Sequence, residues 1–98
     1  MSEENESASN NGKLSARDLT REAKATIADL TGRPPETVSA MQWDGDTWLI
    51  TVEVCELRRV PNTTDVMASY VVQLDDQGGL LGYKREHRYL RGSSEDGR

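Results

Sequence analysis

The first regular hydrophobic pattern along the chain has the period of a helix. Apolar side chains recur at intervals of four, four and three residues, at Leu19, Ala23, Ile27 and Leu30. This spacing places them on one narrow stripe of a helix surface, and the charged side chains fall elsewhere. Ser15 is a typical N-cap residue that Asp18 can complete as a capping box, and Gly32 suits the left-handed position after the last turn. We predict one helix over about residues 15–31.

After Pro35 the hydrophobic period becomes two, which is typical of β-strands. The clearest strand covers residues 47–57, and its inward alternation is formed by Trp48, Ile50, Val52 and Val54. A weaker strand over 38–43 precedes it across the tight turn 44–46, so Trp43 should face Trp48. A third strand is predicted over 66–74 and a fourth over 80 to about 90. Apolar residues occupy both odd and even positions of the fourth strand, so the sequence does not decide its register.

These elements predict an α+β fold in which one N-terminal helix packs on a four-stranded antiparallel meander sheet. The sheet face away from the helix is expected to meet solvent, yet it carries apolar residues: Leu49, Cys55, Leu57, Met67 and Val71. We interpret them as ordinary surface residues, because over half of a normal protein surface is apolar. A homodimer formed through this second face is the alternative.

The 98 residues are enough for one small domain only. Residues 1–13 are rich in Glu, Ser and Asn, and such a segment cannot bury enough apolar surface to offset its chain entropy. We predict a disordered acidic tail over 1–13, a single α+β domain over 14–91 and a flexible end over 92–98.

The composition limits the expected cellular location of the protein and the classes of molecule that it could bind. The chain lacks an apolar run long enough to cross a membrane, and its acidic start does not resemble a secretory signal, so we expect a cytoplasmic protein without membrane contact. The single cysteine, Cys55, agrees with a reducing compartment. The formal charge of −5 argues against duplex DNA, because nucleic-acid affinity depends on neutralising phosphates.

No pattern of residues predicts catalysis, a metal site or a cofactor. His87 is the only imidazole, and without a placed nucleophile or second ligand it is expected to be a surface histidine of a strand. Cys55 is expected to be a small, unreactive hydrophobic residue. The acidic pairs at 44–46 and 75–76 lie where hairpin turns favour Asp for backbone reasons, so we assign them to turns.

The closing segment is the unusual feature of the chain, because it interleaves aromatic and basic side chains. The candidate partner-binding residues are Tyr83, Lys84, Arg85, Arg88, Tyr89 and Arg91, together with Arg58 and Arg59 from the loop before the third strand. Arginine on a strand can pair with an acidic protein surface, and aromatic side chains can stack on single-stranded bases. A third interpretation is a solvated edge strand that its charges protect from aggregation.

Several features in order make the chain resemble the gas vesicle protein O family. They include Trp48, the alternating 52–54 segment with Glu56 and Arg59, Pro61, Asp65, the 70–75 strand, Gly79, and the spaced ending Tyr83, Arg85, Arg88, Tyr89 and Arg91. The likeness covers about residues 15–91. No single element is specific, but their order and spacing are.

The resemblance implies a non-enzymatic accessory protein that is required for gas vesicle assembly and is not the shell-forming subunit. Its implied partners are other gas vesicle accessory proteins, with the shell protein as a second candidate, and it implies no cofactor. We therefore expect the basic fourth strand and the 58–59 loop to bind an acidic patch on another assembly protein, in the cytoplasm or at gas vesicles. The rival functions are a small α+β binding or inhibitor module and a regulator that binds RNA through the same strand.

Overall fold

The computed structural model describes residues 14–93, and the predicted tail over 1–13 and most of the predicted flexible end lie outside this range. Within it, a helix precedes four strands, with a short 3-10 turn between the second and third. The bounds are α2 Ala16–Thr31, β1 Pro35–Trp43, β2 Trp48–Leu57, η1 Asn62–Thr64, β3 Val66–Leu74 and β4 Leu80–Leu90. The predicted helix and strands are all present, and β1 starts three residues earlier than expected.

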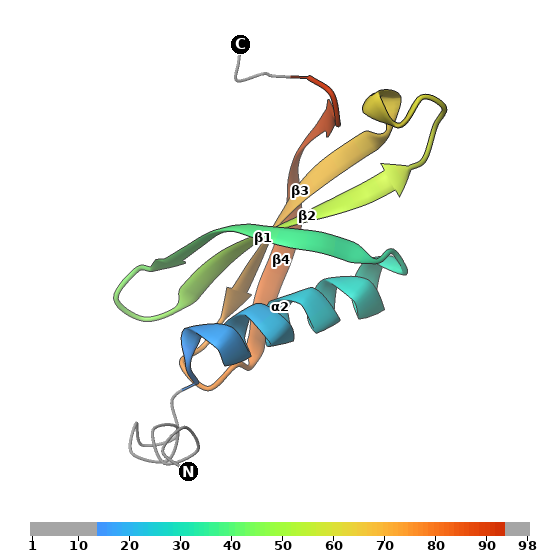
Figure 1. Ribbon diagram of the computed structural model, residues 1–98. Helices are drawn as coiled ribbons and strands as arrows, with labels where there is room; N and C mark the ends of the chain where they lie inside the picture. Colours follow the sequence, from blue (N-terminus) through green and yellow to red (C-terminus); the bar gives the residue numbers. More distant parts are fainter. Residues whose placement is uncertain (1–13, 94–98) are drawn as a thin grey trace.

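The strands form one antiparallel sheet in the order β1-β2-β3-β4, so β1 and β4 are its edges. The sheet is strongly twisted, and α2 lies across one of its faces (Figure 1). The predicted α+β fold, a helix on a four-stranded meander, is therefore confirmed.

Local sequence sets both ends of α2. The Ser15 hydroxyl accepts a hydrogen bond from the Asp18 amide at 3.1 Å, and the Asp18 carboxylate accepts one from the Ser15 amide at 3.4 Å, which completes the predicted capping box. At the other end Gly32 adopts a left-handed conformation with φ of 72°, and its amide donates to the Ala28 carbonyl. Pro34 then prevents the helix from continuing.

The core lies between the helix stripe and the inner strands. Its fully buried members are Leu19, Ala23 and Ile27 from α2, with Ile50, Val52, Val54, Ala68, Val72 and Leu74 from β2 and β3. Leu30 shares the predicted stripe but is 45% exposed, because it lines an open cleft at the end of the helix. The packed part of the stripe therefore ends at Ile27.

The second face of the sheet is less open than expected. Cys55 and Met67 are opposite each other on β2 and β3 and are only 6% and 3% exposed, so the interpretation of these two as surface residues was wrong. The sheet curls at this end, and Arg91 after β4 reaches Glu36 of β1 past the two inner strands. This ion pair therefore links the two edges at the end of the sheet where Cys55 and Met67 are buried. Leu49 and Val71 are half-buried on this face. The prediction that Leu57 lies on this face was wrong, because the register shift after Cys55 pairs it with Val66 and places it, exposed, on the helix side.

The hairpin turns behave as their residues indicate. Trp43 and Trp48 face each other across the first turn, with ring centroids 5.2 Å apart. The Asp44 carboxylate accepts hydrogen bonds from the backbone amides of Asp46 and Thr47, and Asp75 does the same for the turn before β4. The prediction that these aspartates are turn residues is confirmed.

The different burial of two leucines on one helix stripe gives a matched test of the core. Leu19→Ala should lower the free energy of unfolding by about 2–5 kcal/mol, because it opens a cavity in the packed core. Leu30→Ala should cost less than about 1 kcal/mol, because that side chain already meets solvent. Urea unfolding followed by circular dichroism measures both, and equal losses would contradict this description of the core.

Candidate functional site

A basic cleft of about 490 Å³ opens where the end of α2 meets the sheet. Its walls come from four parts of the chain, and they are formed by Leu30, Thr31, Arg33, Glu56, Leu57, Tyr70, Tyr83, Arg85 and Arg88. The cleft therefore joins the turn after the helix to the end of β2 and to the middle of β3 and β4, segments that lie far apart in the sequence. Three arginines and one glutamate give its walls an excess of positive charge.

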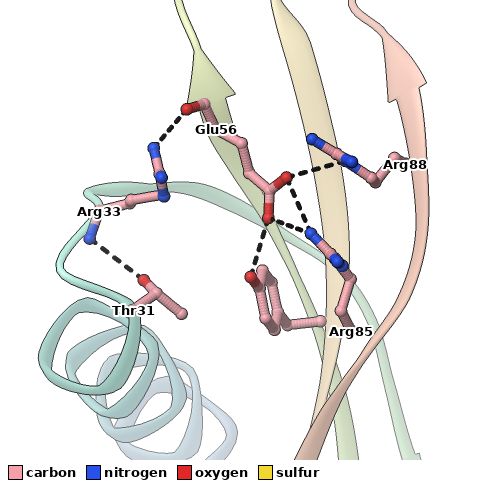
Figure 2. A network of polar contacts seen from close by, with 6 residues as sticks. Thr31, Arg33, Glu56, Arg85 and Arg88 are labelled. Carbon is pink, nitrogen blue, oxygen red and sulfur yellow. Dashed lines mark hydrogen bonds and ion pairs between the residues drawn. The ribbon is translucent and has the colours of Figure 1, made fainter.

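Glu56 is at the centre of the polar contacts in the cleft (Figure 2). Its side chain is only 7% exposed. The carboxylate accepts a hydrogen bond from the Tyr70 hydroxyl at 2.9 Å and pairs with Arg85 Nη1 and Arg88 Nε at 3.1 Å each. Both guanidinium groups are thereby held on one side of β4.

The cleft contacts shift two pKa values in opposite directions. Burial acts to raise the pKa of Glu56, but the hydrogen bonds from Tyr70 and Arg85 and the charges of Arg85 and Arg88 outweigh it and hold that pKa below its usual range. Burial and the bond to the Glu56 carboxylate raise the pKa of Tyr70. Glu56 is therefore an anion, and Tyr70 a neutral donor, at neutral pH.

Arg33 ties the end of the helix to this network. Its guanidinium donates to the backbone carbonyl of Glu56, and its own amide donates to the Thr31 hydroxyl (Figure 2). The Thr31 hydroxyl in turn donates to the Ile27 carbonyl at 2.7 Å. These bonds fix the turn between α2 and β1 beside the end of β2.

A second group of carboxylates holds the residue that follows β4. Arg91 Nε donates to Asp65 at 3.0 Å, and its two terminal nitrogens donate to Glu36 at 2.9 and 2.8 Å. The hydrogen bond from the Arg59 amide is the main reason that the pKa of Asp65 is lowered, although its burial opposes this, and the bond from Arg91 lowers the pKa of Glu36. Arg91 thus has a structural set of contacts.

Tyr89 belongs to a polar cluster on the opposite face of the sheet. Its hydroxyl and that of Ser69 each donate to Glu53 Oε1 at 2.7 Å, and the Ser39 hydroxyl donates to Glu53 Oε2 at 2.6 Å. Burial and the bond to Glu53 raise the pKa of Tyr89, so it stays a neutral donor. Each of the four strands contributes one residue to this cluster.

The structure divides the predicted partner-binding residues among several places. Register pairs Tyr83, Arg85 and Arg88 with core-facing residues of β3, so they lie on the helix side and line the cleft. Lys84 and Tyr89 are paired with Val71 and Met67 and lie on the second face. Arg58 and Arg59 are exposed in the loop after β2, and no ion pair among the described residues involves them.

Six of the nine residues that line the cleft were not predicted as members of a site, and the two charged ones among them are Glu56 and Arg33. Glu56 stands in the sequence as an ordinary polar residue at the end of a strand. The alternation of β2 places it on the same face as Val54, but nothing in the sequence indicates its bond to Tyr70. Arg33 lies between the glycine that ends the helix and a proline. No periodic pattern at this position indicates where its side chain points. The excess of arginine in the closing segment was the only available signal, and it led to β4 alone.

The remaining candidate residues show no catalytic arrangement. His87 is exposed on β4, with its ring 5.5 Å from that of Tyr89, and Cys55 is buried. Within residues 14–93, no group of three or more His, Cys, Asp or Glu side chains could hold a metal ion. In the same part of the chain, no helix has both the length and the hydropathy needed to cross a membrane.

A helix laid on a twisted four-stranded sheet with a basic edge strand defines a small α+β protein, and its sequence relatives identify the family. Residues 2–95 match the family described as "Gas vesicle synthesis protein GvpO". No solved structure matches the chain.

Curated relatives agree with this family. "Gas vesicle protein O" of Streptomyces sp. (strain CB03234) is 49% identical over 75 residues, which cover 76% of this chain and 59% of the relative. "Gas vesicle protein O1" of Halobacterium salinarum is 32% identical over 74 residues, covering 76% and 62%. The corresponding protein of Haloferax mediterranei is 38% identical over 53 residues, covering 54% and 38%.

The chain therefore belongs to the gas vesicle protein O family, as its sequence pattern indicates, and this supports a role in gas vesicle formation. The family carries the name of a gas vesicle synthesis protein and not that of an enzyme class. The match spans about three fifths of the length of the Streptomyces and Halobacterium relatives.

Acid should weaken the protein by protonating the carboxylates that hold β4 and the residue after it. The pKa values of Glu36 and Glu56 lie below the ordinary 4.5, and that of Asp65 lies below 3.8. A carboxyl whose pKa is lowered by folding stabilises the fold above its unfolded pKa, and this contribution is lost as the pH falls through the folded value. Thermal melts should therefore change little from pH 7 to about 5 and drop progressively below about pH 4.

A matched pair of variants tests whether Glu56 contributes to this loss. Glu56→Gln should lower stability at pH 7 by about 1–2 kcal/mol, because Arg85 and Arg88 lose their charged partner, and it should fall less steeply in acid. Glu86→Gln, on the exposed part of β4, should behave like the unaltered protein. An acid transition that is equally steep in all three proteins would contradict the role of Glu56.

Proposed function

We propose that the protein is a non-enzymatic accessory factor of gas vesicle formation, and that it acts in the cytoplasm by binding other gas vesicle proteins. Membership of the gas vesicle synthesis family supports the process. The docking surface in this proposal comprises the β4 strand and the loop that carries Arg58 and Arg59. Its partner is an acidic patch on another assembly protein, because a basic surface attracts and orients an acidic one.

One observation supports this surface above the others: arginines of β4 are exposed and also fixed in position. The side chains of Arg85 and Arg88 are 45% and 57% exposed, while Glu56 holds one nitrogen of each. Side chains that are ordered before binding lose less conformational entropy when a partner docks. A merely solvated edge strand needs charge but does not need its arginines anchored.

The arginine after β4 is less suitable for testing this proposal than the two arginines of the loop. Arg91 bonds to the buried Asp65 and to Glu36, so its substitution would disturb the fold together with any docking. Arg58 and Arg59 are exposed loop residues, so their replacement should leave the fold intact.

Capture experiments with a matched control test the surface. Arg58→Glu with Arg59→Glu should reduce the capture of other gas vesicle proteins by the tagged chain at least about tenfold, since two charges on the docking loop are reversed. Arg17→Glu with Arg21→Glu makes the same charge change on the exposed side of α2 and should capture as the unaltered chain does. If both pairs leave capture unchanged, the loop is not part of a docking surface.

Complementation tests the process itself. A host strain that lacks the gene should form no gas vesicles by electron microscopy, and the unaltered chain should restore them. The Arg58→Glu/Arg59→Glu chain should restore few, whereas Arg17→Glu/Arg21→Glu should restore them fully. Normal gas vesicles in the strain without the gene would overturn the proposed function.

A further inference from the structure

We propose that the cleft at the end of α2 binds a short acidic and apolar segment of a partner protein. In this proposal a Glu or Asp carboxylate of the segment lies between Arg85 and Arg88, and a neighbouring apolar side chain packs against Leu30 and Leu57. The proposal deepens the proposed function, because it assigns a ligand chemistry to one part of the docking surface.

The charge of the cleft supports an anionic ligand. Arg33, Arg85 and Arg88 line it, and Glu56 is the only acidic residue among the residues that form its walls. Because Glu56 is 7% exposed and already accepts bonds from Tyr70 and both β4 arginines, little of its charge faces an incoming group. The solvent side of the cleft is therefore positive, although the whole chain carries −5.

The geometry of the arginines also suits a carboxylate. A guanidinium has five N–H donors, and the bonds to Glu56 use Nη1 of Arg85 and Nε of Arg88. Their remaining donors belong to side chains that are about half exposed. Arginine forms paired, charge-assisted hydrogen bonds to a carboxylate, and here Glu56 restrains the two groups beforehand.

The flanks of the cleft supply apolar contact beside the charge. Leu30, Leu57 and Tyr83 line the walls and are 45%, 48% and 45% exposed. Leu30 belongs to the apolar stripe of α2 but has no core to pack against, so a ligand that covers it would gain apolar burial. A segment with alternating acidic and apolar side chains would meet both features at once.

Two observations favour a peptide over a nucleic acid. Two of the exposed apolar residues in the walls are aliphatic leucines, which do not stack on bases as aromatic side chains do. The net charge of −5 would also oppose the approach of a phosphate chain with many charges, whereas one carboxylate needs only the local excess of arginine.

Fluorescence anisotropy with the purified chain tests the proposal directly. The probe is a labelled peptide of alternating glutamate and leucine, and a glutamate and serine peptide of equal length and charge is the comparison. The unaltered chain should bind the leucine peptide, and Arg85→Gln with Arg88→Gln should weaken binding by about tenfold or more, because charge-assisted hydrogen bonds are lost. Absence of binding to the unaltered chain would overturn the proposal.

Matched variants separate the cleft from general electrostatics and from loss of structure. Arg17→Gln with Arg21→Gln removes two charges from the exposed side of α2, outside the docking surface, and should not change binding. Leu30→Ala leaves the Glu56 network intact and should weaken the leucine peptide about threefold without affecting the serine peptide. Equal losses in cleft and control variants, or tighter binding of a labelled oligouridine than of either peptide, would refute the proposal.

Capture experiments distinguish the failure of this proposal from the failure of the proposed function. If Arg85→Gln with Arg88→Gln abolishes peptide binding and also reduces the capture of gas vesicle proteins, the cleft is part of the docking surface. If these variants capture gas vesicle proteins as the unaltered chain does, the cleft is not the site of that contact, and the loop surface of Arg58 and Arg59 stands or falls on its own test.

Discussion

The pairing of carboxylates with the arginines of the last strand is the interaction on which this structure depends. Glu56 holds Arg85 and Arg88, and Asp65 with Glu36 holds Arg91. Apart from these pairs, β4 is held by its backbone bonds to β3 and by contacts such as the hydrogen bond from Tyr89 to Glu53, since α2 packs mainly on the first three strands. The same contacts set the fold of one edge and the shape of the cleft, so the stability of this edge and the shape of the cleft are coupled.

This coupling explains how surface side chains can have fixed positions in a protein with a small core. The packed core is limited to one stripe of the helix and the inner strands, and a domain of this size buries too little apolar area to be rigid everywhere. Buried carboxylates restrain the long arginine side chains that the core does not reach. A polar network that is fully bonded can specify one arrangement in this way, whereas a partly bonded one would cost free energy.

Periodicity predicted the fold almost completely, and the limits of that prediction have a physical cause. Helix caps, the two-residue period and turn residues such as Asp44 act locally, so the elements and their order could be predicted from neighbouring residues. The curl of the sheet buries Cys55 and Met67 on the face expected to meet solvent, and Glu56 at the end of β2 is paired with two arginines of β4. Both depend on contacts between distant strands, as does Arg33 reaching β2. The cleft was therefore recognised only as an excess of arginine.

The contact between Arg91 and Glu36 has a consequence for self-association. It draws the two borders of the sheet toward each other at one end, whereas open-ended stacking of copies needs both borders straight and accessible. Curvature of this kind lets a protein expose a long β4 without serving as a template for fibres. The exposed edge strand is thus combined with a sheet shape that does not favour end-to-end growth.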